Sequence, residues 1–141
     1  MYGRHGDLEK AVQEFKTAIK LKPNYGDAYH NLGNTYREMG KLKEAEESYK
    51  QAIKYNPRLW QSFQNIAAIS FERGKYEEAQ SYSEKAVLVN SINPELYVDL
   101  GIIYLKQKNK ESARQAFQKA LQLDPQNKRA QMGMSLLDKG I

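Results

Sequence analysis

The sequence predicts an all-α protein built of stacked antiparallel helix pairs, and three observations lead to this fold class. Alanine recurs at intervals of 34 residues in two series, Ala11, Ala45, Ala79 and Ala113, then Ala18, Ala52, Ala86 and Ala120. Small residues keep the same interval at Gly33, Ala67 and Gly101. Between these sites the apolar residues follow helical spacing, with glycine or proline at the ends of the stretches. A fixed period of this length is typical of repeats that each contribute a helix pair.

Gly33 lies inside the helix-forming stretch AYHNLGNTY, residues 28–36. A glycine there costs about 1 kcal/mol relative to alanine. Helices that pack at the short end of the roughly 8–10 Å range need such a small residue at the crossing. We therefore expect Gly33 and Gly101 to be crossing points between helices, and we do not expect them to form a phosphate-binding loop.

Eight helices are predicted, near residues 8–21, 25–39, 42–55, 59–73, 76–89, 94–107, 110–123 and 127–138. Gly40 and Gly74 follow two of these helices as C-terminal stops. Asn93 and Pro94 form the N-terminal cap and first position of another helix.

Two units resemble the tetratricopeptide repeat, whose pattern is W-x2-L-G-x2-Y, A-x3-F, P. The matching residues are Tyr29, Leu32, Gly33, Tyr36, Ala45, Tyr49 and Pro57, and Tyr97, Leu100, Gly101, Tyr104, Ala113, Phe117 and Pro125. The third unit has Ser70 and Ser83 in place of aromatic residues. The first unit is partial, with Tyr2, Gly6, Ala11, Phe15, Ala18 and Pro23.

The resemblance implies a right-handed α-solenoid, a tetratricopeptide superhelix that forms a single domain over residues 1–141. Residues 1–25 would be a partial repeat lacking its first helix, and 26–59, 60–93 and 94–127 would be full repeats. Residues 128–141 would be a capping helix or the start of a fifth repeat.

Composition and motifs argue against several classes of function. The net charge is +5, but acidic and basic residues are interspersed, so we expect no nucleic-acid binding. No cysteine is present, which fits a reducing compartment and favours a cytoplasmic location. His5 and His30 stand outside metal-ligand spacings, and no catalytic or phosphate-binding motif occurs, so we expect no metal, cofactor or catalysis. No apolar run approaches the roughly 20 residues of a membrane helix, so no membrane partner is expected.

In solenoids of this family the first helix of each unit lines the concave surface. Helical spacing places ten candidate peptide-binding residues there: His30, Asn31, Asn34, Gln64, Asn65, Phe71, Val98, Asp99, Ile102 and Leu105. The first five are rich in amides, whereas the later ones, together with Met132 and Leu136, are mostly apolar. Asn31, Asn65 and Asp99 share the 34-residue spacing and resemble the asparagine ladder in the repeat region of O-linked N-acetylglucosamine transferase.

The family members that grip acidic chaperone tails use lysine, arginine and asparagine at five positions, which here hold His30, Asn34, Gln64, Glu95 and Asp99. Here Asn34 alone is retained, and Glu95 and Asp99 replace the final basic pair. Two carboxylates would repel an acidic tail, so this specialised function is not expected.

The leading hypothesis is a non-catalytic interaction scaffold that binds a peptide or helix of a partner protein in the concave groove. One alternative is a structural module in which the repeats mainly self-associate, and another is a regulatory part of a larger protein. The incomplete first unit should expose an apolar face, through which we expect another copy to bind or to swap a helix.

Overall fold

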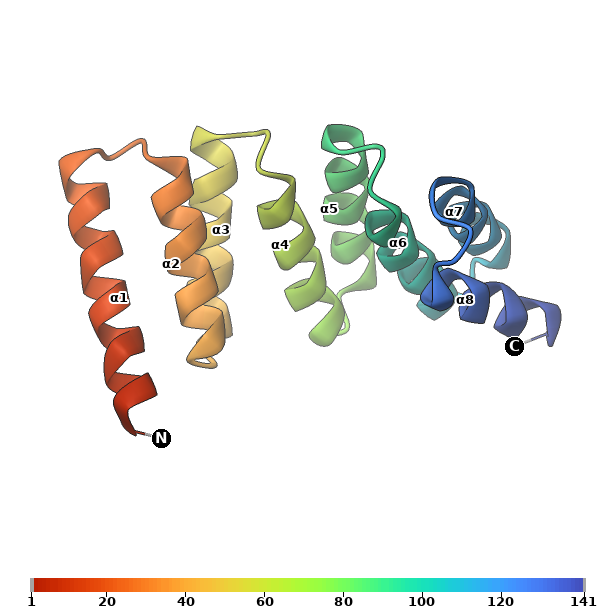
Figure 1. Ribbon diagram of the computed structural model, residues 1–141, viewed down its shortest axis with the longest axis horizontal. Coiled ribbons are helices and arrows are strands. Elements are labelled where there is room, and N and C mark those ends of the chain that lie inside the picture. Colours follow the sequence, from red (N-terminus) through yellow and green to blue (C-terminus); the bar gives the residue numbers. More distant parts are fainter. Residues whose placement is uncertain (1, 141) are drawn as a thin grey trace. The chain divides into compact units, whose positions relative to one another are not determined.

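The computed structural model describes residues 2–140, with side chains from Gly6 onward, and this part of the chain is helical without any strand (Figure 1). Its eight helices are α1 (Tyr2–Leu21), α2 (Gly26–Glu38), α3 (Leu42–Tyr55), α4 (Trp60–Glu72), α5 (Tyr76–Val89), α6 (Pro94–Lys106), α7 (Lys110–Leu123) and α8 (Lys128–Asp138). The predicted all-α class is confirmed, and the bounds from α2 to α8 agree with expectation to within one residue.

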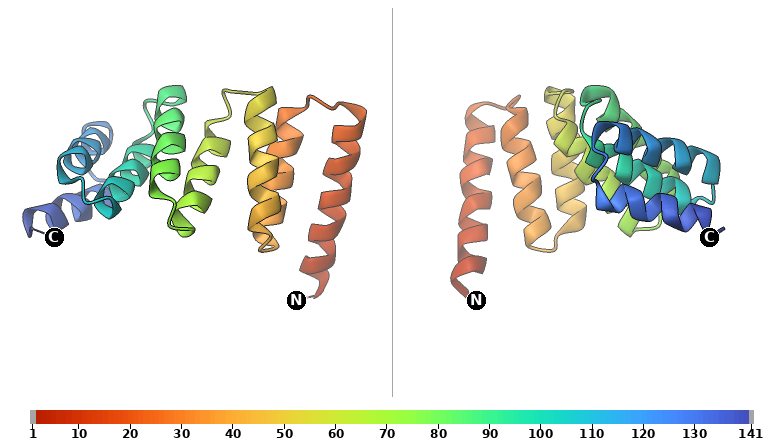
Figure 2. Two further views of the ribbon diagram at one scale, coloured as in Figure 1. Left: turned by 180° about the vertical axis from the view of Figure 1, so that it is seen from behind. Right: turned by 45° about the vertical axis from the view of Figure 1, so that its right-hand side comes forward.

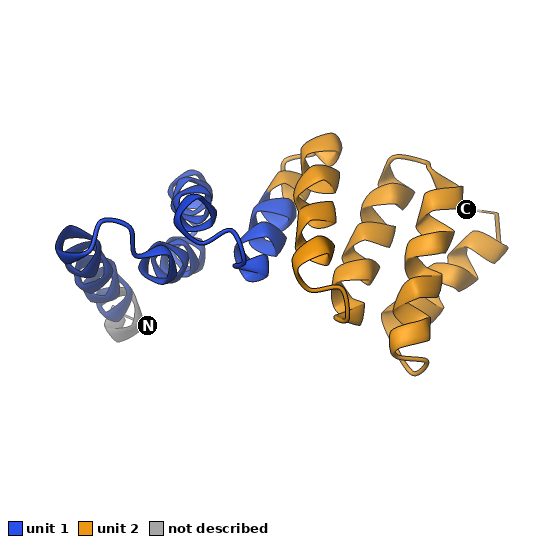
Figure 3. Ribbon diagram, turned by 90° about the horizontal axis from the view of Figure 1, so that it is seen from above, with its two compact units in different colours: residues 1–69 blue, residues 70–141 orange. Residues whose placement is uncertain are grey.

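The helices form two compact units, residues 1–69 and residues 70–141 (Figure 3). The first unit holds α1 to α3 and most of α4, and the second holds the end of α4 with α5 to α8. Within the first unit α2 pairs with α3, and within the second α6 pairs with α7 (Figure 2).

Small residues sit where the paired helices touch, as the 34-residue interval predicts. A Cβ atom built on Gly33 would lie 2.7 Å from the ring of Tyr49, and one on Gly101 would lie 2.7 Å from the ring of Phe117. Such distances are well below van der Waals contact, so only glycine allows the second helix to approach this closely. The alanines of the two series in α3, α5 and α7 are all 0% exposed: Ala45, Ala52, Ala79, Ala86, Ala113 and Ala120.

The first helix is longer than predicted, because α1 begins at Tyr2 instead of near residue 8. Gly6 stands 34 residues before Gly40, the position of a turn, yet it is helical. A Cβ atom on Gly6 would meet nothing within 4 Å, so no neighbouring helix constrains the backbone there. Without such contacts a helix propagates residue by residue, which explains the extra turns. The side chains of Tyr2 and His5 lie outside the described part.

The turns within the helix pairs use a left-handed residue. Gly40 has φ +79° and Gly74 has φ +76°, which confirms both as helix stops. Lys108 takes the corresponding place after α6 with φ 62°, a conformation that costs a residue with a side chain about 1–2 kcal/mol. The predicted cap at Asn93 is also confirmed, since its Oδ1 accepts a 3.0 Å hydrogen bond from the backbone N–H of Glu95.

Candidate functional site

Five of the ten candidate residues lie in the first unit, where α2 and α4 bring their polar side chains together. Arg37 Nη1 donates to Asn65 Oδ1 at 2.8 Å, and Asn65 Nδ2 donates to Asn34 Oδ1 at 3.4 Å. The hydroxyl of Tyr49 donates to the same Asn34 oxygen at 2.5 Å. Burial raises the pKa of the Tyr49 hydroxyl to about 12, against the opposing effect of the nearby Arg37 guanidinium. These bonds use much of the hydrogen-bonding capacity of Asn34 and Asn65, which we expected a bound peptide to use.

His30 also belongs to this polar surface, although it is half-buried. Its Nδ1 lies 2.7 Å from the Oγ of Ser62, which is 0% exposed, and its ring packs 5.5 Å from that of Tyr49. Burial lowers the pKa of the imidazole, and the carboxylate of Asp27 opposes the shift. The neutral ring therefore predominates at neutral pH. Asn31 is exposed and Gln64 is half-buried on the same surface.

In the second unit, Asp99 and its neighbours form a charged cluster that the sequence reasoning did not anticipate. Arg129 of α8 donates to Glu95 Oε1 at 2.6 Å and to Asp99 Oδ1 at 3.2 Å. Asn127, the N-cap of α8, donates to the other oxygen of Glu95 at 2.5 Å. The two carboxylates expected to repel an acidic ligand are thus partly neutralised.

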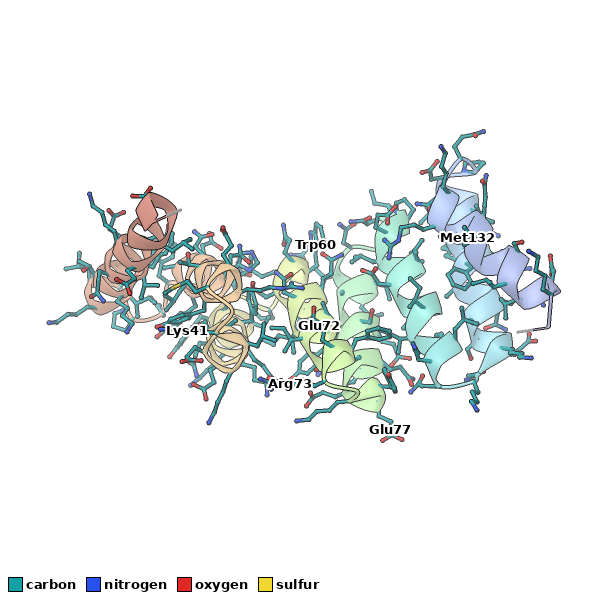
Figure 4. All side chains as sticks on the ribbon, turned by 90° about the horizontal axis from the view of Figure 1, so that it is seen from below. Lys41, Trp60, Glu72, Arg73, Glu77 and Met132 are labelled. Carbon is teal, nitrogen blue, oxygen red and sulfur yellow. The ribbon has the colours of Figure 1, made fainter. Side chains whose placement is uncertain are left out.

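An apolar hollow lies beside this cluster, between α6 and α8 in the second unit. Its volume is about 320 Å³. It is lined by Ile102, Leu105, Phe117, Lys128, Arg129, Met132, Gly133 and Leu136. Ile102 and Leu105 are two of the predicted site residues, and Met132 on α8 is 63% exposed (Figure 4). The lining is apolar apart from Lys128 and Arg129, so the hollow suits an apolar group with a polar edge.

Gly133 is one of the lining residues, and its position could be read from the sequence. It follows Asp99 by 34 residues, so it occupies the fourth position of the series Asn31, Asn65 and Asp99. A Cβ atom there would lie 2.5 Å from the Phe117 ring. The missing side chain lets the Phe117 ring pack against the backbone of α8, where the earlier units carry an amide or a carboxylate.

The two remaining candidates, Val98 and Phe71, also belong to the second unit. Val98 is 0% exposed and packs with Ala113 and Ala130, so its assignment to the binding surface is wrong. Its burial follows from α8, which packs over the side of α6 that the helical spacing had left open. Phe71 is half-buried, and its ring packs against Tyr76 with the centroids 5.3 Å apart.

Among residues whose side chains are described, no group of three or more histidine, aspartate or glutamate residues could hold a metal ion. The helices of the described region are too short or too polar to cross a bilayer.

Family profiles match most of the chain. Profiles described as tetratricopeptide repeat match residues 26–59 and 70–137, and one described as TPR repeat matches residues 1–40. No protein of curated function matches the sequence.

Solved structures share the fold. The crystal structure of MamA has a TM-score of 0.88 and 23% identity, over 97% of this chain and 80% of that one. A tetratricopeptide repeat protein from Parabacteroides merdae has a TM-score of 0.87 and 28% identity, over 98% of this chain and 55% of that one. The first TPR domain of Spaghetti (RPAP3), bound to the HSP90 peptide SRMEEVD, has a TM-score of 0.77 and 23% identity, over 82% of this chain and 92% of that one.

Proposed function

Because this chain belongs to the tetratricopeptide repeat family, we propose that it is a non-catalytic module that binds a peptide or helix of another protein. Within the second unit, the apolar hollow would receive a bulky apolar side chain of that partner. Repeats of this kind stack their helices into an extended surface that can bind a partner.

The hollow between α6 and α8 is the observation that carries the proposal. Water in such a space gains few hydrogen bonds, because Ile102, Leu105 and Leu136 offer none. Burying an apolar side chain of a partner would release that water and stabilise the complex by roughly 25 cal/mol per Å² of area removed from water. Binding sites of this size are typically apolar with a few polar groups at the edge.

The polar surface of the first unit supports the same function less directly. Arg37, Asn34 and Asn65 are hydrogen-bonded to one another, so a peptide would have to compete with these bonds. Asn31 remains exposed, and its amide could pair with the backbone of an extended peptide. We therefore assign the affinity mainly to the hollow.

The test is a selection of phage-displayed random peptides on the purified protein, followed by affinity measurements on the enriched peptides. These should share a bulky apolar residue. Met132→Asp should weaken their binding at least about tenfold, since it places a carboxylate against the apolar lining. Met132 is largely exposed, so the substitution should leave the fold intact.

The matched control is Leu88→Asp, which makes the same kind of change at an 81% exposed apolar residue of α5 outside the hollow. Its peptide affinity should equal that of the wild type. Peptides that bind Met132→Asp as tightly as the wild type would refute the hollow as the binding site. Methyl-labelled methionine offers an independent readout, because the Met132 signal should shift on binding while that of Met39 in the first unit should not.

A second candidate function is self-association through α1, and one comparison within the chain favours it. Ala11, Phe15 and Ala18 are only half-buried. The residues at the same places in α3 are Ala45, Tyr49 and Ala52, and all are 0% exposed. Light scattering over a concentration series would detect the association, and a strict monomer at high micromolar concentration would exclude it.

A further inference from the structure

We propose that two copies of this chain associate through α1 in an antiparallel pair related by a two-fold axis. The inference rests on the proposed self-association and specifies its geometry. It concerns one stripe along α1, formed by Asp7, Ala11, Phe15, Ala18 and Lys22, which we call the α1 stripe.

The α1 stripe is continuous because its members follow one another at intervals of four, four, three and four residues. This spacing keeps side chains on one face of a helix. Lys22 follows the last residue of α1, but its backbone N–H still bonds to Ala18 O at 2.9 Å, so it continues the helical path. Asp7 and Lys22 are both exposed, at opposite ends of the face.

The middle of the stripe has the composition of a helix-packing face. Ala11, Phe15 and Ala18 match Ala113, Phe117 and Ala120 of α7, which are all 0% exposed beneath neighbouring helices. On α1 the same three positions are half-buried, although α1 packs against α2 (Figure 1). The face therefore has the residue sizes that helix packing requires, with small residues where a further helix would come close.

The charges at the two ends indicate which helix fits. In an antiparallel pair whose centre lies between Glu14 and Phe15, Asp7 of each copy faces Lys22 of the other, and Ala11 faces Ala18. Two ion pairs would then flank a centre where the two Phe15 rings lie beside each other, with Glu14 of each copy at the edge of the face. A parallel pair would place Asp7 beside Asp7 and Lys22 beside Lys22, which is unfavourable. A self-complementary face of this kind is what a two-fold dimer requires.

Lys22 has one existing contact, since its Nζ lies 5.1 Å from the centre of the Tyr25 ring. A lysine side chain is long and flexible, so this contact leaves its ammonium free to turn toward a carboxylate. The pair across the interface would remain exposed to solvent, so the dimer should weaken as salt concentration rises.

The experiment is sedimentation equilibrium of the full chain and of charge-exchanged variants. We expect a wild-type dimer with a measurable dissociation constant. Asp7→Lys and Lys22→Asp should each weaken dimerisation by about tenfold or more, because each creates two like-charge contacts in a two-fold pair. The double variant with both exchanges restores opposite charges and should dimerise within about threefold of the wild type.

Lys20→Asp is the matched control. It makes the same charge change in the same helix, but helical spacing places Lys20 on the opposite side from the α1 stripe, so its dissociation constant should stay at the wild-type value. Circular dichroism of every variant checks that α1 remains folded.

A dimer that neither exchange weakens, or one that the double exchange fails to restore, would overturn the antiparallel pairing while leaving self-association through another surface intact. A monomer at all concentrations would overturn both the pairing and the self-association. Peptide binding to the hollow in the second unit is measured separately, so neither result affects it.

Discussion

The ring of Phe117 lies directly against Gly133, so close that a Cβ atom on that glycine would come within 2.5 Å of the ring. Gly101 of α6 touches the same ring, since a Cβ atom there would lie 2.7 Å away. One aromatic side chain of α7 thus packs on glycines of two other helices. Because Phe117 also lines the apolar hollow, the packing of α8 and the shape of the proposed binding surface depend on the same contact.

Gly133→Ala should destabilise the protein by about 1–3 kcal/mol, because the added methyl group overpacks the Phe117 ring. Urea denaturation followed by circular dichroism measures the free energy of unfolding. Gly6→Ala is the control, since nothing lies within 4 Å of its Cβ position in α1. It should stabilise by about 0.5–1 kcal/mol through helix propensity. Unchanged stability of Gly133→Ala would show that the ring can move away without cost.

Lys108→Gly should raise the free energy of unfolding by up to about 1 kcal/mol. The substitution removes the strain of a left-handed lysine at φ 62°, and this gain exceeds the added flexibility of glycine in the unfolded chain. Gly74→Ala makes the reverse change at the corresponding turn and should lose about 1 kcal/mol. Thermal denaturation of both variants measures the two changes in stability. A loss of stability in Lys108→Gly would show that the left-handed lysine is not strained.

Stability should fall as the pH drops below about 6.5 because of His30. Burial lowers the pKa of its imidazole below the ordinary value of 6.5, so the unfolded chain binds the proton more readily than the folded one. The contribution is complete above pH 6.5 and is lost as the pH falls toward the lowered value. The free energy of unfolding, measured from about pH 7.5 to about pH 5, should begin to decline near pH 6.5 in the wild type. His30→Gln should flatten it, and an equal slope in the variant would assign the effect to other groups.

Two of the ten tyrosines should ionise late in an alkaline titration. Burial raises the pKa of Tyr49 to about 12, and burial together with the 2.9 Å bond to Glu84 raises the pKa of Tyr104 to about 12. Folding favours the protonated forms, so their contribution to stability is complete below pH 10 and is lost as the pH rises through 10 toward 12. Phenolate absorbance follows the titration. Tyr104→Phe should remove one late group, whereas an unchanged late phase would contradict its assignment.

The helix pairs and their crossing points could be predicted from sequence because they depend on residue size at fixed spacing. Gly33 and Gly101 have to be small wherever a second helix crosses at close range, and the 34-residue interval reports that requirement directly. The length of α1 could not be predicted in the same way. Gly6 matches a turn position, but a turn there depends on contacts from a neighbouring helix, and nothing lies within 4 Å of its Cβ position.

The candidate site was predicted less completely, because burial depends on helices distant in the sequence. Ile102 and Leu105 do line a hollow, as their apolar character on a polar face suggested. Val98 satisfied the same spacing but lies beneath α8, whose path the spacing alone does not define. Arg129 of α8 bonds to Glu95 and Asp99 of α6. Such pairs between helices leave no local signal in the sequence.

The shared contact at Phe117 has a consequence for how the protein opens. Helix α8 has only 11 residues, which is too short to persist alone in water. Its amide hydrogens should therefore exchange with solvent only when α7 releases the ring, as one cooperative event instead of gradual fraying. A ligand seated in the hollow would slow that exchange across α6, α7 and α8 together.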